Sequence, residues 1–167
     1  MDVESQRKLK VQITSGYTTE VIGKLKQLED LNIFLDGRTA LGYAVSCNNI
    51  EVVKFLLENG ADPNLSESKP DTYTPLMWAA ESEPLEIVKL LLEYGADVHR
   101  KNKNNNATAL WKTVIPNNLE AAKLLVAAGA NPFVEIAAGK SIYDAVKDIN
   151  ALEFIAYFES VQGDFEK

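Results

Sequence analysis

The residue types that most often carry catalysis are scarce in this chain. The 167 residues include one histidine, His99, and one cysteine, Cys47. A serine nucleophile needs a histidine partner, and a structural zinc site needs about four cysteine or histidine ligands. Neither set can be assembled from this inventory, so we expect no enzymatic activity, no cofactor and no metal.

Two short patterns could suggest phosphate or acid–base chemistry. Gly139-Lys140-Ser141 is like the end of a phosphate-binding loop, but such a loop needs a glycine five positions before Gly139, where this chain has Val134. Glu81, Glu83 and Glu86 are close in sequence. They indicate either a solvated acidic rim or half of an electrostatic contact with a basic partner.

The charge balance bounds the kind of partner. Lys and Arg number 17 and Asp and Glu number 24, which gives a formal net charge of −7. Nucleic-acid binding needs a concentrated basic surface, and the basic side chains cluster only at residues 99–103. We therefore expect a protein partner and no nucleic acid, and an acidic surface favours a basic protein.

The apolar pattern predicts no membrane segment. The longest apolar runs, such as Leu90-Leu91-Leu92, are far shorter than the roughly 18 residues that a membrane span requires. The first six residues contain no basic patch followed by an apolar stretch, so we expect no secretory signal. A single cysteine fits a reducing compartment. These features favour a cytoplasmic location, and no sequence feature suggests more than a monomer.

Three segments in register organise the chain. Thr39-Ala40-Leu41, Thr74-Pro75-Leu76 and Thr108-Ala109-Leu110 begin 35 and 34 residues apart, and each threonine is followed 21 residues later by a glycine. A self-similar period in this range predicts a solenoid of stacked repeats, in which each repeat is one supersecondary unit.

Each repeat is expected to contain two helices. In the second one, Thr74 can cap an inner helix over 75–81, Pro75 suits its first turn, and Gly95 can end an outer helix over 85–94. The same pattern predicts helices at 41–47, 51–59, 110–115 and 119–128. Apolar stretches predict further helices at 5–13 and 152–158.

These segments resemble the ankyrin repeat. The resemblance rests on Gly37-Arg38-Thr39-Ala40-Leu41, on Thr74 to Ala80 and on Leu90 to Val98. It implies an all-α ankyrin-repeat solenoid of helix-turn-helix units with long or hairpin-like connecting loops, forming a single domain. The expected units are a divergent N-terminal cap (5–32), three repeats (33–68, 69–102 and 103–135), a C-terminal cap (136–160) and a tail (161–167).

The resemblance also implies where a partner docks. In the ankyrin family the concave side binds partners, through the loop tips and the exposed face of the inner helices. His99 falls where the family places a polar group that hydrogen-bonds the loop, so we expect that role for it. The partner-binding residues that the resemblance implies are Asp36, Arg38, Ser46, Asp71, Tyr73, Trp78, Glu81, Ser82, Asn104, Asn105, Trp111, Ile115, Lys140 and Asp148.

The aromatic members of that set have two interpretations. Trp78 and Trp111 lie at adjacent positions of the inner helix in successive repeats, so they either pack between repeats or form a binding hot spot. Tyr73 is the stronger hot-spot candidate because it falls in a loop.

The resemblance implies a non-enzymatic protein-binding module. Small ankyrin proteins occur in bacteria as immunity proteins, and this chain is acidic and consists of repeats. Its most specific interpretation is therefore an inhibitor or immunity protein that neutralises a toxic, basic enzyme. The alternative is a regulatory adaptor or scaffold that binds an endogenous cellular protein.

Overall fold

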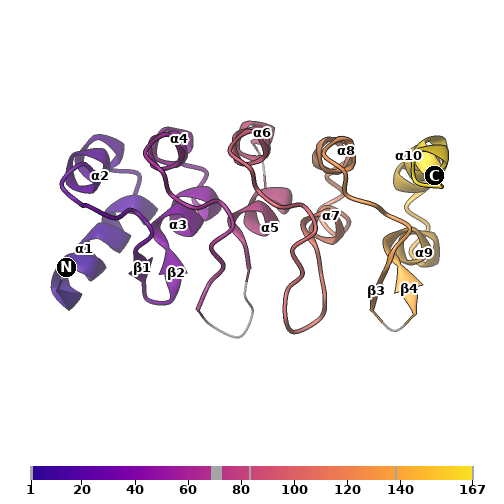
Figure 1. Cartoon of the computed structure of the whole chain (residues 1–167), viewed down its shortest axis with the longest axis horizontal. Coiled ribbons are helices and arrows are strands. Elements are labelled where there is room, and N and C mark those ends of the chain that lie inside the picture. The colour runs from indigo at the N-terminus through magenta and orange to yellow at the C-terminus, as the bar shows by residue number, and fades with distance from the viewer. Residues whose placement is uncertain (1, 69–72, 83, 138, 167) are drawn as a thin grey trace.

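Two rows of helices, stacked side by side, form the computed structural model of this chain (Figure 1). The structure describes residues 2–68, 73–82, 84–137 and 139–166. The inner row contains α1 (Val3–Thr14), α3 (Ala40–Ser46), α5 (Pro75–Ala80), α7 (Ala109–Lys112) and α9 (Ile142–Asp148). The outer row contains α2 (Thr18–Leu25), α4 (Ile50–Glu58), α6 (Leu85–Glu93), α8 (Leu119–Ala127) and α10 (Leu152–Val161), which a short 3₁₀ turn (Gln162–Asp164) follows.

Neighbouring pairs contact one another along each row. The inner helices α1, α3, α5 and α7 touch in succession, as do the outer helices α2, α4, α6 and α8. Their facing sides form one continuous apolar core that runs from Leu9 in α1 to Phe158 in α10. The expected all-α repeat solenoid is therefore confirmed.

Two short hairpins project from the inner row (Figure 1). Strand β1 (Phe34–Leu35) pairs antiparallel with β2 (Arg38–Thr39), and β3 (Glu135–Ala137) pairs with β4 (Lys140–Ser141). Asp36 and Gly37 both have positive φ, 54° and 87°, which is the backbone that a two-residue hairpin turn requires. The hairpins place Arg38 and Lys140 immediately before an inner helix.

A buried hydroxyl caps four of the inner helices. The Oγ atoms of Thr39, Thr74, Thr108 and Ser141 each accept a hydrogen bond from the backbone amide three residues later, at 2.9–3.3 Å. Such caps satisfy amides that would otherwise lack an acceptor at a helix start. The caps explain why α3, α5, α7 and α9 begin immediately after these residues.

The outer helices α4, α6 and α8 each end in a left-handed turn at a glycine. After α6, Gly95 has φ +83°, and the amide of Ala96 returns to the carbonyl of Leu91 at 2.9 Å. The predicted helix limits hold within a few residues, except that α7 ends at Lys112 rather than 115. Pro116 accounts for the early end, because it has no amide to donate to the carbonyl of Lys112 and its ring would clash with that carbonyl in a continuing helix.

Asparagine side chains join successive repeats near these turns. The Oδ1 atom of Asn32 accepts from the amide of Asp62 at 2.8 Å. Asn64 repeats this contact one unit later, with its Oδ1 atom 2.7 Å from the amide of Asp97. These hydrogen bonds hold the loops at a constant distance from one another, so that the loop tips and the inner helices form a regular array.

Candidate protein-binding face

Three positions recur in each of the four repeats whose inner helix begins after a capping threonine or serine. We name them relative to the capping residue: the tip position lies one residue before it, the middle position four residues after it and the end position seven residues after it. The tip positions hold Arg38, Tyr73, Ala107 and Lys140. The middle positions hold Tyr43, Trp78, Lys112 and Ala145, and the end positions hold Ser46, Glu81, Ile115 and Asp148.

Arg38 bridges the first two repeats of this array. Its guanidinium lies 5.0 Å from the ring centroid of Tyr43 and 4.1 Å from that of Trp78. Its Nη1 atom donates to the hydroxyl of Ser46 at 3.0 Å, and its Nε atom donates to the carboxylate of Glu67. The same carboxylate accepts from the indole nitrogen of Trp78 at 3.2 Å. Glu67 therefore fixes both the cation and the ring on which the cation stacks.

The stack continues into the next repeat. The ring of Tyr73 lies against that of Trp78, with centroids 4.8 Å apart and planes at 38°. The ammonium of Lys112 lies 4.1 Å from the centroid of the Tyr73 ring, donates to the Tyr73 hydroxyl and pairs with Glu81 at 2.9 Å. At the other end, Lys10 lies 5.4 Å from the Tyr43 centroid and pairs with Asp36 at 2.8 Å.

These contacts form one side-chain ladder across the inner helices. We define the ladder by its members Lys10, Tyr43, Arg38, Trp78, Tyr73 and Lys112, with the carboxylates Glu67 and Glu81. Cation–aromatic pairs of this kind stabilise by about 0.5–2 kcal/mol each. Tyr73 and Trp78 lie in the ladder, partly buried, and support the interpretation in which aromatic residues pack between repeats.

The sequence analysis missed four members of this ladder. Lys10, Tyr43, Glu67 and Lys112 were not among the residues that the resemblance implied. The register could have indicated Tyr43 and Lys112, because they share the middle position with Trp78. No local signal indicates Glu67, which lies in the connecting segment after α4 and reaches Arg38 only through the tertiary fold.

The ladder stops in the third repeat. Its tip position holds Ala107, which has no side chain long enough to continue the stack. Its end position holds Ile115, whose side chain is 81% exposed, whereas Ser46, Glu81 and Asp148 each accept from a cation. Beyond this break, Lys140 pairs with Asp148 on the last repeat.

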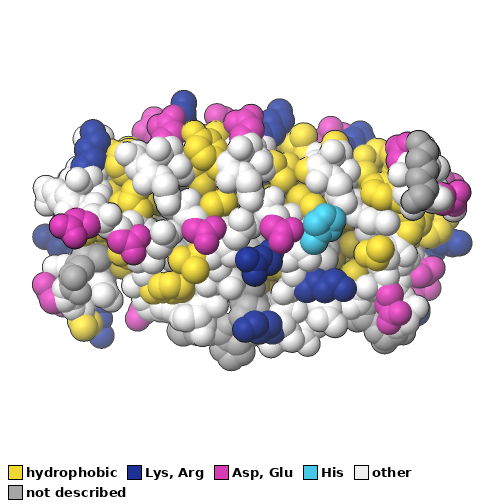
Figure 2. Space-filling view, viewed as in Figure 1, with side chains coloured by type: hydrophobic (Ala, Val, Ile, Leu, Met, Phe, Trp, Pro, Cys, Tyr) yellow, Lys and Arg dark blue, Asp and Glu magenta, His cyan; other side chains and the backbone are white. Residues whose placement is uncertain are grey.

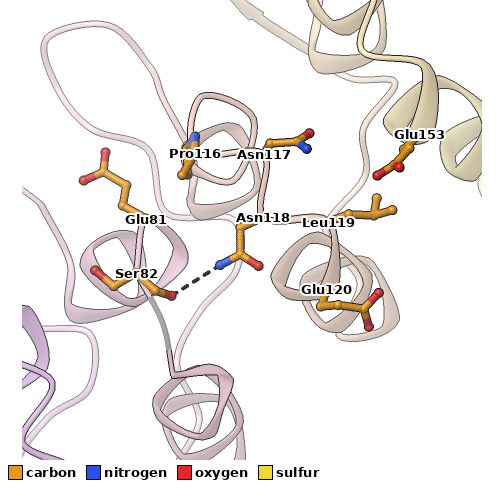
Figure 3. Close-up of a pocket in the computed structure, with 8 residues that line it drawn as sticks. All are labelled: Glu81, Ser82, Pro116, Asn117, Asn118, Leu119, Glu120 and Glu153. Carbon is orange, nitrogen blue, oxygen red and sulfur yellow. Dashed lines mark hydrogen bonds between the residues drawn. The ribbon is translucent and has the colours of Figure 1, made fainter.

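Two adjoining depressions open at this break. One, of about 320 Å³, is lined by Glu81, Trp111, Lys112, Ile115 and Pro116. The other, of about 350 Å³, is lined by Glu81, Ser82, Pro116, Asn117, Asn118, Leu119, Glu120 and Glu153 (Figure 3). They share Glu81 and Pro116, and we call them together the third-repeat groove.

The third-repeat groove has carboxylates along its length. Figure 3 shows Glu81 at one side and Glu120 and Glu153 at the opposite side, from three successive repeats. Burial raises the pKa of Glu81 above its ordinary value. The floor is held by Asn118, whose amide donates to the carbonyl of Ser82 at 3.3 Å. The groove is therefore a fixed acidic surface between two turns.

Trp111 differs from Trp78 in its surroundings. It is partly exposed on α7, at the edge of the third-repeat groove, one position before the middle position. Within the residues that the structure describes, its indole nitrogen has no hydrogen-bond acceptor, whereas that of Trp78 donates to Glu67. Trp111 thus presents an unused donor and part of a ring next to the exposed Ile115.

The remaining implied residues lie in loops or outside the described residues. Asn105 shapes the α6–α7 loop by accepting from the amide of Ala107 at 3.2 Å, and the amide of Asn104 donates to Asn102 at 2.7 Å. Asp71 and Glu83 lie outside the described residues.

His99 does not make the loop contact that the resemblance implied. Its imidazole is exposed and has no hydrogen-bond partner among the described residues. The loop is held instead by Asp97, whose carboxylate accepts from the backbone amide of His99 at 2.9 Å. The backbone donor already satisfies the turn, so the ring can remain in solvent.

Charge on the face of the molecule seen in Figure 2 is mixed. Acidic side chains form a row across this face, and basic ones gather below the row, near its middle. In the described ranges, no three His, Cys, Asp or Glu residues lie close enough together to hold a metal ion. No helix found there has both the length and the apolar character needed to cross a membrane.

A comparison with known families agrees with this architecture. A family model described as ankyrin repeats in three copies matches residues 11–102 and residues 66–136, which together cover well over half of the chain. No curated protein matches the chain.

Proposed function

Because this chain belongs to the ankyrin-repeat family, whose repeats serve protein–protein interaction, we propose that it is an inhibitor that binds a basic enzyme through its concave face. The concave face consists of the loop tips and the exposed side of α1, α3, α5, α7 and α9. In its most specific form, the chain is an immunity protein that neutralises a toxic enzyme.

The observation that carries the proposal is the third-repeat groove. Glu81 lies at the end of the inner helix α5, and Glu120 and Glu153 lie at the border of the concave face, on the outer helices α8 and α10. All three belong to a chain with a net charge of −7. Acidic surfaces accelerate encounter with basic proteins and select against acidic ones. Exposed Ile115 and partly exposed Trp111 add apolar area beside these charges, which is the composition of an interface anchor.

A regulatory adaptor is the second candidate. The ladder supports this candidate, because Arg38, Tyr73 and Trp78 already contact one another. The N-terminal half of the face is therefore a preorganised surface on which a protein can dock. An adaptor would bind an endogenous protein without stopping a reaction. The two candidates differ in the partner and in the effect on its activity.

Affinity capture from the native lysate tests the proposal. The tagged chain is compared with a variant that carries Glu81→Lys and Asp148→Lys on the concave face. A matched control carries Glu51→Lys and Glu93→Lys, which make the same charge change at exposed positions of the outer helices α4 and α6. Captured proteins are identified by mass spectrometry, and any purified enzyme is assayed with increasing amounts of the chain.

We expect a basic enzyme that is captured by the unmutated chain and by the control, is lost with the concave variant, and is inhibited at a stoichiometric ratio. Capture of a protein whose activity the chain leaves unchanged would favour the adaptor. Equal capture by all three baits would place the binding surface elsewhere.

A further inference from the structure

The break in the side-chain ladder points to a binding site for one kind of side chain. We propose that the third-repeat groove receives an arginine of the partner, with its guanidinium against Glu81 and Trp111 and its alkyl part against Ile115 and Pro116. This inference rests on the proposed function for its choice of a basic protein partner. It adds the residue that the partner inserts and the position at which it binds.

The chain contains an internal precedent for this arrangement. Arg38 stacks on Trp78 with 4.1 Å between guanidinium carbon and ring centroid, while the carboxylate of Glu67 accepts from its Nε atom. Arginine suits such a site better than lysine because its planar group stacks on a ring while it donates to a carboxylate in the same plane. One repeat after this pair, Trp111 and Glu81 line one depression that contains no arginine of this chain.

The ring and the exposed aliphatic side chain at this site lack the internal contacts of their counterparts. The indole nitrogen of Trp111 has no acceptor among residues 2–68, 73–82, 84–137 and 139–166, so it can donate to a backbone carbonyl of an inserted segment. Ile115 is 81% exposed although it occupies the end position, which is polar in the other three repeats. A methylene chain laid along Ile115 and Pro116 would remove this apolar surface from water.

Glu81 has the capacity to bind a second cation. Its Oε1 atom pairs with Lys112 at 2.9 Å, and its Oε2 atom has no partner in the described part of the chain. The side chain is one-third exposed, so a ligand can reach it from the groove. Partial burial disfavours the charged carboxylate, and an incoming guanidinium would compensate for this cost through charge-assisted hydrogen bonds.

The second depression indicates where the neighbouring residue of the partner would lie. Glu153 lies across it from Glu81 and forms no ion pair within the described residues (Figure 3). Glu120 already pairs with Lys123 at 2.6 Å. A second basic residue, next to the anchoring arginine in the partner, would therefore extend toward Glu153.

A peptide titration monitored by NMR tests the site without a known partner. The full chain, labelled with ¹⁵N, is titrated with N-acetyl-Ala-Arg-Arg-Ala-amide. The control peptide contains citrulline in place of both arginines, which keeps the shape and removes the charge. The chain has two indole N–H resonances, and Trp78→Phe identifies which of them belongs to Trp111.

We expect the Trp111 resonance to shift and saturate with the arginine peptide, while the Trp78 resonance and the citrulline titration show no saturating shift. Glu81→Gln should weaken binding by at least about tenfold, which is the loss expected for a hydrogen bond to a charged group. Glu93→Gln is the matched control, because it makes the same charge change at the exposed end of α6, which does not line the groove. It should change the affinity by less than about twofold, since surface charges at a distance are screened.

Any of four results would overturn the proposal. The two peptides could cause equal shifts, the two indole resonances could shift equally, no shift could saturate, or the two charge variants could have equal effects. The result is separable from that of the lysate capture. Binding of the peptide at Trp111 without capture of a basic enzyme would support the arginine site and contradict the inhibitor function. Loss of capture with the concave variant, without peptide binding, would leave the inhibitor and remove the arginine site.

Discussion

The guanidinium of Arg38 lies 4.1 Å from the centroid of the Trp78 ring, across the boundary between two repeats. Arg38 ends the first hairpin, and Trp78 belongs to the inner helix of the following repeat. In a solenoid each repeat contacts only its neighbours, so stability depends on the interface between adjacent units. This pair therefore contributes directly to the interaction energy between adjacent repeats.

Removing the cation from this pair should destabilise the chain. In Arg38→Ala, the carboxylate of Glu67, whose side chain is only 12% exposed, loses a charged donor. We expect the free energy of unfolding to fall by about 1–3 kcal/mol, the range for losing a hydrogen bond between charged groups, because the carboxylate keeps only the neutral indole of Trp78 as a donor. Urea unfolding followed by circular dichroism measures the change.

Arg100→Ala is the control for this experiment. Arg100 pairs with Asp97 at 3.6 Å with both side chains about half exposed, so its removal should cost less than about 1 kcal/mol. Adding Glu67→Gln to Arg38→Ala should restore part of the loss. Equal costs for Arg38→Ala and Arg100→Ala would contradict a structural role for the ladder.

Two glycines in helices should respond in opposite ways to alanine. At Gly23 in α2, an added Cβ would meet no atom within 4 Å, so Gly23→Ala should stabilise by about 0.5–1 kcal/mol through helix propensity. At Gly42 in α3, the Cβ would lie 2.9 Å from Cγ of Arg38 and 3.2 Å from the capping Oγ1 of Thr39. Gly42→Ala should therefore lower the thermal midpoint, because it displaces the base of the ladder.

Thermal unfolding of both variants checks this pair of expectations. A higher midpoint for Gly42→Ala, equal to that of Gly23→Ala, would mean that Arg38 moves aside at no cost.

The capping threonines should each contribute measurably to stability. Thr74 accepts from the amide of Met77 at 3.3 Å and is buried, so Thr74→Ala should cost about 1 kcal/mol. Thr74→Ser keeps the hydroxyl and should recover most of that loss. Urea unfolding of the three proteins gives the comparison, and an equal loss for serine and alanine would assign the effect to the methyl group rather than to the cap.

The last repeat should make the stability depend on acid. The carboxylate of Asp144 accepts from the hydroxyl of Ser141 at 2.7 Å and from its amide at 2.9 Å, and these bonds lower the pKa of Asp144 below its ordinary value of 3.8. A carboxylate whose pKa is lower in the folded chain than in the unfolded chain stabilises the fold at pH values above the unfolded-state pKa. This stabilisation is lost as the pH falls through the folded-state pKa.

Asp144→Asn, which cannot titrate, should therefore be less stable than the unmutated chain near neutral pH and closer to it at about pH 2.5. Urea unfolding at the two pH values measures the difference. An unchanged difference between the proteins would show that the capping box does not contribute to acid sensitivity.

Local chemistry explains why the sequence was sufficient for the repeats. Thr74, Pro75 and Gly95 act within one helix or one turn, so their spacing predicts where helices begin and end. The exception within this local level was α7, where Pro116 ends the helix earlier than its apolar spacing suggests. The period of the three segments was likewise enough to indicate a stacked solenoid.

The side-chain ladder depended on contacts between residues that are far apart in the chain. Sequence position indicated Tyr73 and Trp78 as surface candidates, but only the fold brings Arg38, Glu67 and Lys112 to them. The register of the stack, which local signals do not encode, decides which exposed side chains already have partners within the chain.

The sequence by itself thus determined the helices, their caps and the repeat architecture, because hydrogen bonds and apolar periodicity over a few residues are sufficient for these. Tertiary structure alone decided that the ladder is continuous from Lys10 to Lys112 and stops beside Ile115. The physical reason is that cation–aromatic contacts, ion pairs and desolvation depend on distances between side chains of different repeats. These distances are set only when each helix pair has packed against the next.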